Sequence, residues 1–234
     1  MIESLFIALG LFALTYLPAV AITGVWTKYA KEKIITLQKT FLSLVFLSIS
    51  TFDALILIFG ISGGNYISYG FNIGNELIMP TAIITVLILR AILSLLANLI
   101  PQKKHLYISS SSFTLPELFI NCIFVSISEE IIFRGLIQSY LSVNISCMVY
   151  LFNSQISLPA IISAVLFALL HLGLLLHGKT SRQLLLILPG TFIFGVIAGY
   201  FRDATGSLLT PIVIHIIFNF SGKGVEFIKL KYLS

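Results

Sequence analysis

Long apolar runs recur along the whole chain and constrain its fold more than any other feature. Seven of them come close to the roughly 20 residues that a helix needs to cross a bilayer. They fall near residues 4–26, 41–61, 77–100, 116–133, 157–176, 184–201 and 207–221. Backbone groups in lipid must be hydrogen-bonded internally, and no run alternates with period two. We therefore expect each run to be an α-helix.

The composition supports a chain whose main solvent is lipid. Of its 234 residues, 58% are hydrophobic and only 10% are charged, whereas soluble domains carry about a quarter charged residues. We predict an all-α, polytopic transmembrane bundle of seven to eight helices, the eighth being the short apolar stretch 141–152. We expect one membrane domain over 1–234. It comprises three N-terminal transmembrane helices (1–115), a catalytic core (116–222) and a basic tail (223–234).

The positive charge of the chain points to lipid rather than to nucleic acid. The formal net charge is +5, but the basic residues lie mostly between apolar runs, where they act as topology signals and contact anionic headgroups. No basic stripe is interleaved with aromatic residues, which argues against nucleic acid as a partner.

Several ionisable residues lie inside the apolar runs, where each costs about 2.5–3.5 kcal/mol on insertion scales. Such residues persist where they pair or where function requires them. They are Asp53, Arg90, Glu129, Glu130, Arg134, His171 and His215, and the last run adds the polar Asn219. Asp53 and Arg90 are an acid and a base on consecutive helices, and we expect a structural ion pair between them.

The segment from Glu129 to Arg134 has the most informative spacing. Glu130 and Arg134 are four residues apart, so they share a helix face and can pair. Glu129 is rotated by about 100° from Glu130 and is left without an intrahelical cation. A carboxylate against a low-dielectric wall suits a general base. The alternative is that the trio only marks a helix end at the membrane interface, with Gly135 directly after it. The motif alone does not separate the two.

Two further pairs repeat the four-residue spacing. Phe167 and His171 share one helix face, and His215 and Asn219 share another. A lone histidine in a membrane helix usually hydrogen-bonds to a neighbouring helix. The combination changes the interpretation, because polar groups on three helices are most easily satisfied if they converge on one polar cavity.

These residues resemble the CPBP family of intramembrane proteases, which includes the CAAX prenyl endopeptidases and bacterial bacteriocin-processing or self-immunity proteins. The family pattern is EExxxR, FxxxH and HxxxN. Here it reads Glu129-Glu130 with Arg134, Phe167 with His171, and His215 with Asn219, over roughly residues 116–222. The resemblance implies an eight-helix fold with a site near a membrane-embedded cavity. The partly polar spacer 141–156 departs from the pattern without touching a motif residue.

Two chemistries fit these residues. In the first, Glu129 and His171 activate water, while His215 and Asn219 donate to the oxyanion. In the second, Glu129, His171 and His215 hold Zn²⁺ with water as the fourth ligand. No HExxH is present, which excludes the usual zincin helix. We favour the metal-free site, with no cofactor, because asparagine is a poor zinc ligand and a good oxyanion donor.

The substrate implied by the resemblance is a membrane-associated peptide or protein. A compact chain without extra domains indicates a bacterial relative in the cell membrane that processes a peptide or confers bacteriocin immunity. Two other classes compete with a protease: a proton-coupled transporter and a non-catalytic membrane scaffold. A transporter usually shows two related halves, but here the ionisable groups crowd into the C-terminal half and no repeat is visible.

Overall fold

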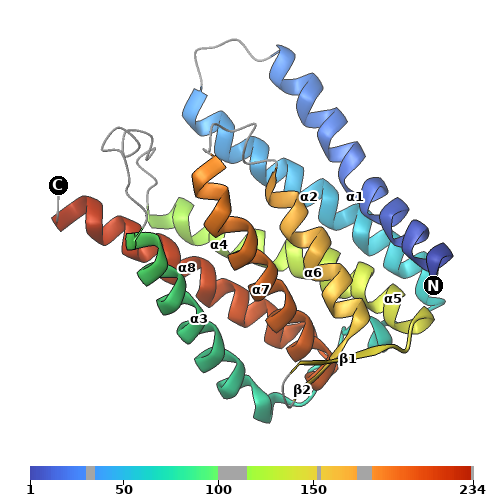
Figure 1. Ribbon diagram of the computed structural model, residues 1–234. Helices are drawn as coiled ribbons and strands as arrows, with labels where there is room; N and C mark the ends of the chain where they lie inside the picture. The colour runs from blue at the N-terminus through green and yellow to red at the C-terminus, as the bar shows by residue number, and fades with distance from the viewer. Residues whose placement is uncertain (30–34, 100–114, 152–153, 173–180, 233–234) are drawn as a thin grey trace.

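The computed structural model describes residues 1–29, 35–99, 115–151, 154–172 and 181–232, and most of them are helical (Figure 1). The α-helices are α1 (Ile2–Tyr29), α2 (Ile35–Ser62), α3 (Met79–Leu99), α4 (Leu115–Glu130), α5 (Ser139–Asn144), α6 (Leu158–Leu170), α7 (Ser181–Thr205) and α8 (Leu209–Tyr232). Two short 3₁₀ turns, η1 (Tyr66–Tyr69) and η2 (Glu76–Ile78), lie between α2 and α3. A π-helical segment, η4 (Ile131–Gln138), continues α4 directly into α5.

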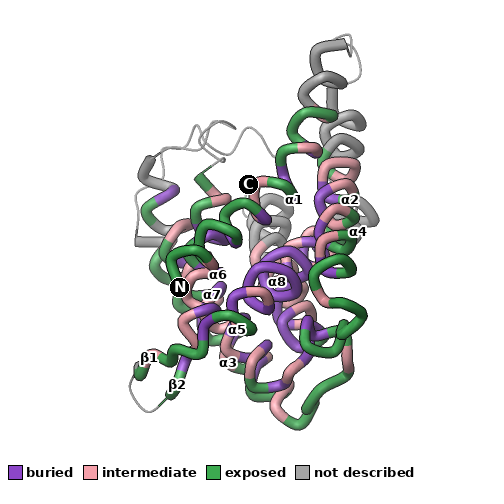
Figure 2. The backbone as a smooth tube through the Cα atoms, turned by 90° about the vertical axis from the view of Figure 1, so that its right-hand side faces the viewer, coloured by how far each residue is buried: buried purple, intermediate pink, exposed green. Residues whose placement is uncertain are grey.

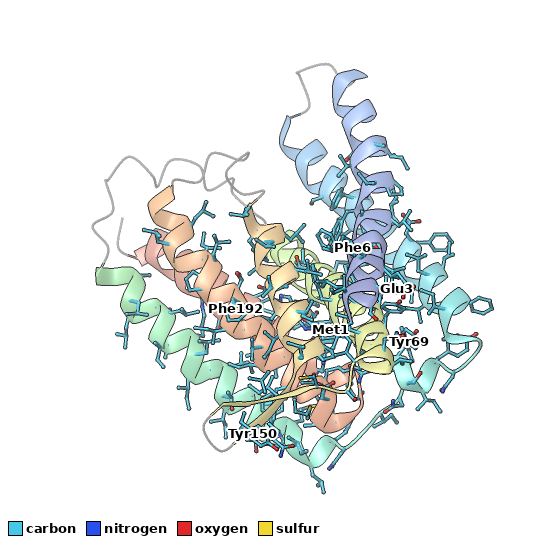
Figure 3. The ribbon with its side chains drawn as sticks, turned by 45° about the vertical axis from the view of Figure 1, so that its right-hand side comes forward. Met1, Glu3, Phe6, Tyr69, Tyr150 and Phe192 are labelled. Carbon is cyan, nitrogen blue, oxygen red and sulfur yellow. The ribbon has the colours of Figure 1, made fainter. Side chains whose placement is uncertain are left out.

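Three helical segments of the described chain are long and apolar enough to cross a membrane. They are Ile2–Thr23, Ser43–Ser62 and Glu76–Ala97, while Leu158–Leu170 and Leu209–Gly222 are apolar but shorter. Large apolar side chains face outward on this bundle, among them Phe6 on α1, which is 69% exposed (Figure 3). An outward apolar surface of this extent fits contact with lipid. The helical character is confirmed, and the number of seven to eight spans stays a prediction.

The stretch 141–152, expected as a short eighth helix, takes a different form. Its first residues close α5, which ends at Asn144, and the chain then turns into strand β1 (Met148–Leu151). Strand β1 pairs antiparallel with β2 (Ser154–Ser157), with Val149 opposite Ile156. Four apolar or aromatic residues in β1 suit a strand, and a helix this short lacks the length to offset its nucleation. The all-α expectation therefore needs correction for this hairpin at one end of the bundle (Figure 1).

The expected ion pair between Asp53 and Arg90 is wrong. Helix α2 packs against α1, α4 and η4, whereas α3 packs against α7 and α8. The Arg90 guanidinium lies 5.3 Å from the centre of the Phe218 ring on α8. Among the described residues, no ion pair joins Asp53 to Arg90. Helices that follow each other in the chain need not pack together, and here the connection between α2 and α3 carries α3 to the other side of the bundle.

Helices α6 and α7 approach closely through small residues. An added Cβ on Gly195 would lie 2.9 Å from the Cβ of Ala164, and one on Gly199 would lie 2.8 Å from that of Ala160. The two glycines are four residues apart on α7, and the two alanines are four residues apart on α6. This spacing of small residues lets two helix backbones meet inside a membrane. The buried residues gather in the interior of the bundle around α8 (Figure 2). The close α6–α7 contact and this interior fix the backbone around the motif residues.

Candidate active site

The two glutamates lie where α4 changes into the π-helical segment η4. Glu130 is the last residue of α4, and all eight residues of η4 are buried. A π-helical turn inside a longer helix is rare and is frequent at functional sites. Its wider turn is visible at Ser139, whose hydroxyl donates to the carbonyl of Arg134, five residues earlier, at 2.8 Å. The site thus begins at an irregular turn whose backbone is enclosed by protein.

Glu130 and Arg134 form the expected pair. Nε of Arg134 lies 3.2 Å from Oε2 of Glu130, and both side chains are fully buried. The Nη1 group donates to Oε1 of Glu130 at 3.3 Å. Nη2 of Arg134 donates to the carbonyl of Gly195 on α7 at 2.9 Å, and the guanidinium lies 5.0 Å from the centre of the Phe167 ring. The positive charge of Arg134 is therefore compensated by a carboxylate, a backbone carbonyl and the face of an aromatic ring. A buried guanidinium requires such partners.

His215 on α8 lies between the two glutamates. Its Nδ1 is 2.6 Å from Oε1 of Glu130, and its Nε2 is 3.5 Å from Oε2 of Glu129. Because the ionised carboxylate of Glu130 can only accept, Nδ1 of His215 carries the hydrogen. A short charge-assisted bond of this kind orients the imidazole ring. Glu130 thus ties α4 to α8 and aims Nε2 of His215 at Glu129.

Glu129 has different surroundings from its neighbour. Its side chain is 13% exposed, whereas that of Glu130 is fully buried. Among the described residues, its ion-pair contact is with His215 and with no lysine or arginine. As expected, no ion pair among the described residues joins Glu129 to Arg134. A carboxylate without a cation on its own helix, facing an imidazole, has the surroundings that a general base needs.

His171 reaches the cluster through an aromatic ring. Its Nδ1–H donates to the carbonyl of Phe167 at 2.9 Å, and Nε2, the other ring nitrogen, has no partner among the described residues. The Phe167 ring meets the His171 ring edge-on at 4.9 Å and the His215 ring at 5.9 Å, between centroids. Within the described residues, His171 makes no ion pair with Glu129 or Glu130. Phe167 therefore lies between the two histidines, which gives the FxxxH pattern a physical reason.

Asn219 lies one turn beyond His215 on α8. Its Nδ2 donates to the hydroxyl of Ser126 on α4 at 3.1 Å, and that hydroxyl donates to the carbonyl of Cys122 at 2.7 Å. Ser126 precedes Glu130 on α4, whereas their partners occur in the reverse order on α8, with His215 before Asn219. Helices α4 and α8 are therefore antiparallel. An amide carries two N–H groups, and within the described residues Asn219 uses one of them.

The structure places some of the predicted site residues in direct contact and others nearby. Glu129, Glu130, Arg134 and His215 form one contact cluster, Asn219 lies one turn away, and His171 joins through Phe167. The cavity expected around them stays a prediction.

Several residues that support the site were not predicted from the sequence. They are Ser126, Gln138, Ser163, Gly195 and Gly199. Gln138 donates to the carbonyl of Gly199 at 2.9 Å, parallel to the contact of Arg134 with Gly195. Ser163 on α6 donates to the carbonyl of Phe133 at 2.7 Å. The spacing of the glycines, four apart in an apolar run, was the signal that could have revealed the α6–α7 contact.

The ligand set proposed for zinc is only partly assembled. In the part of the chain that the structure describes, no group of three histidine, cysteine or acidic side chains is placed to hold one ion. Glu129 and His215 approach each other, whereas no contact among the described residues brings His171 to either of them. The metal-free site stays a prediction, and the steps derived below use only the side chains of the chain.

Comparison with known proteins agrees with the motifs. The family model described as Type II CAAX prenyl endopeptidase Rce1-like matches residues 111–221, a segment that holds all three motifs. The match confirms the resemblance seen in the sequence. It supports an integral membrane protein and, in general, an intramembrane endopeptidase that acts on a peptide or protein. No curated protein and no solved structure matches the chain.

The buried pair makes a prediction about stability. Arg134→Ala removes the cation from a fully buried carboxylate and should destabilise the protein by about 3–5 kcal/mol, the usual loss when one partner of a buried pair is removed. Glu129→Gln keeps the size of a partly exposed side chain and should leave folding intact. The measurement is the folded yield and thermal midpoint of each variant in detergent. Equal values for the two variants would contradict the structural role of Arg134.

Proposed function

We propose, from the family match over residues 111–221 and from the cluster around Glu129, that the chain cleaves a membrane-associated peptide or protein inside the bilayer. The observation that carries the proposal is the position of His215, held by Glu130 and facing Glu129 at 3.5 Å. Buried charges are destabilising unless function or pairing retains them. Glu130 is paired with Arg134, whereas Glu129 has no such partner among the described residues. We therefore assign the chemical role to Glu129.

In the proposed mechanism His215 is a hydrogen-bond donor at the reaction centre. The proposal places hydrogens on both of its ring nitrogens, one donated to Glu130 and one directed toward Glu129. Oriented in this way, the imidazole can donate from Nε2 to an oxyanion that forms beside Glu129.

The proposed reaction begins with a water molecule bound to Glu129. The carboxylate takes a proton from the water as the water oxygen attacks the carbonyl carbon of the peptide bond. The free Nε2 of His171 is a second acceptor that orients this water. The oxyanion that forms accepts hydrogen bonds from Nε2–H of His215 and from the second N–H of Asn219. Glu129 then returns its proton to the leaving nitrogen as the carbon–nitrogen bond breaks.

Glu130 and Arg134 have a supporting role in this proposal. Glu130 holds His215 through its Nδ1, and Arg134 neutralises Glu130 and attaches the pair to α7. Neither side chain touches the substrate. Because such contacts fix the orientation of a catalytic imidazole, their loss is expected to lower the rate as well as the stability.

The proposed substrate class follows from the resemblance. It comprises prenylated proteins that end in a CAAX sequence and bacterial peptides processed at the membrane, including bacteriocins in self-immunity. Both classes bring an apolar, membrane-anchored segment to an enzyme whose outer surface is apolar. The proposed location is a cell membrane, where such substrates are anchored.

Glu129 gives the direct test of the activity. The purified protein in lipid nanodiscs is incubated with a fluorogenic farnesylated CAAX peptide, and separately with a membrane-inserted peptide library whose products are identified by mass spectrometry. We expect cleavage of at least one probe and no cleavage by Glu129→Gln, because the base is lost while the fold remains. Absence of cleavage in both assays, or equal cleavage by wild type and Glu129→Gln, would contradict the proposal.

A second prediction separates the two chemistries. Without a metal, the purified protein should contain no stoichiometric zinc, and chelators should leave its rate unchanged. Asn219→Ala should lower the rate by about 10²–10³, as is usual for one oxyanion donor. Elemental analysis and chelator titration of the active preparation check this. One zinc per chain, lost in His171→Ala, would overturn the metal-free mechanism and leave the endopeptidase proposal standing.

A further inference from the structure

Helix α1 lies outside the matched segment 111–221 but packs against the part that holds the EExxxR motif. It contacts both η4 and α5. The ring of Phe12 on α1 lies 6.0 Å from that of Phe133, between centroids. Helix α5 follows η4 in the chain and lies beside the start of α1 (Figure 1). Helix α1 therefore runs antiparallel to the continuous segment formed by α4, η4 and α5. One turn after Phe12, Tyr16 therefore faces the position one turn before Phe133, which is Glu129.

Tyr16 is held firmly in this position. Its ring lies 5.0 Å from that of Phe12 and is stacked at 5.8 Å on that of Phe46 from α2. The residue is 7% exposed. The two aromatic contacts fix the ring from two sides, so the direction of the hydroxyl is set by packing.

The hydroxyl of Tyr16 is buried and has no hydrogen-bond partner among the described residues. A buried tyrosine hydroxyl normally has a partner. The carboxylate of Glu129 interacts electrostatically with this hydroxyl, in agreement with the antiparallel register. Hydrogen bonds at a catalytic site are often long before substrate binds and shorten in the complex. The hydroxyl thus lies near the proposed base and makes no hydrogen bond within the described part of the chain.

We propose that Tyr16 is a positioning residue of the active site, whose hydroxyl donates a hydrogen bond to the carboxylate of Glu129, directly or through one water. An ionised carboxylate only accepts, so the tyrosine is the donor. Oε2 of Glu129 faces His215, and the hydroxyl restrains the same carboxylate from the side of α1. The inference rests on the proposed function of Glu129. It assigns to the N-terminal helices a part in catalysis.

The test uses Tyr16→Phe, which removes the hydroxyl and keeps the ring. With the cleaved probe of the activity assay, we expect kcat to fall about 10- to 100-fold, since a small displacement of a catalytic group has effects of this size. KM should stay within about twofold, because a residue acting through Glu129 alters the chemical step rather than binding. The thermal midpoint should be retained. An unchanged kcat in Tyr16→Phe would overturn the inference.

Two variants serve as matched controls. Phe46→Leu removes the stacked ring but keeps the hydroxyl, so it should lower the thermal midpoint more than kcat. Tyr69→Phe removes the hydroxyl of another buried tyrosine, in η1, and should leave kcat unchanged. If Phe46→Leu lowers kcat as much as Tyr16→Phe with KM unchanged, the effect is one of packing and the positioning role is excluded.

An infrared measurement separates failure of this inference from failure of the proposed function. The carboxylate band of Glu129 is identified as the band lost in Glu129→Gln, and it should shift in Tyr16→Phe in the absence of any substrate. If Glu129→Gln cleaves the probe like wild type, the endopeptidase proposal fails on that result. If Glu129→Gln is inactive while Tyr16→Phe leaves both the band and kcat unchanged, the role of Tyr16 fails and the endopeptidase proposal stands.

Discussion

Glu130 is a carboxylate with no exposed surface in a bundle whose buried side chains are mostly apolar. A charge in such surroundings must be paired on its own helix, on a neighbouring helix or on both. Arg134 supplies the first partner and His215 the second. Because these partners come from η4 and α8, satisfying one charge fixes the relation between two helices. It also turns the free nitrogen of His215 toward Glu129, so the structural need and the proposed chemistry share one set of contacts.

Polar contacts of η4 also connect the cluster to helices α6 and α7. Arg134 and Gln138 use their remaining N–H groups on the carbonyls of Gly195 and Gly199, which attaches η4 to α7. These contacts need a helix surface without side chains at the two positions, and glycine provides it. The same glycines let α6 approach, and Ser163 of α6 then reaches the backbone of η4. The polar cluster is therefore attached to backbone acceptors of α7, and Gln138 links it further to the carboxylate of Asp203.

Much of this could be predicted from local spacing. The apolar runs identify the helices, and the separation of Glu130 from Arg134 identifies their pair, because both depend only on the period of a helix. The remaining features depend on contacts distant in the chain. The position of His215 between two glutamates, the π-helical turn and the β-hairpin carry no strong local signal. The separation of Asp53 from Arg90 depends on which helices pack together, and the approach of Tyr16 to Glu129 depends on the antiparallel course of α1.

The account depends most on the coupling between Glu130 and His215, and a double-mutant cycle measures it directly. The free energy of unfolding in detergent is measured for wild type, Glu130→Gln, His215→Gln and the double variant. A short buried contact predicts that the effects of the single changes are strongly non-additive, with a coupling energy of about 1–3 kcal/mol. Additivity within about 0.5 kcal/mol, the behaviour of distant and independent sites, would contradict the claim that Glu130 holds His215 in place.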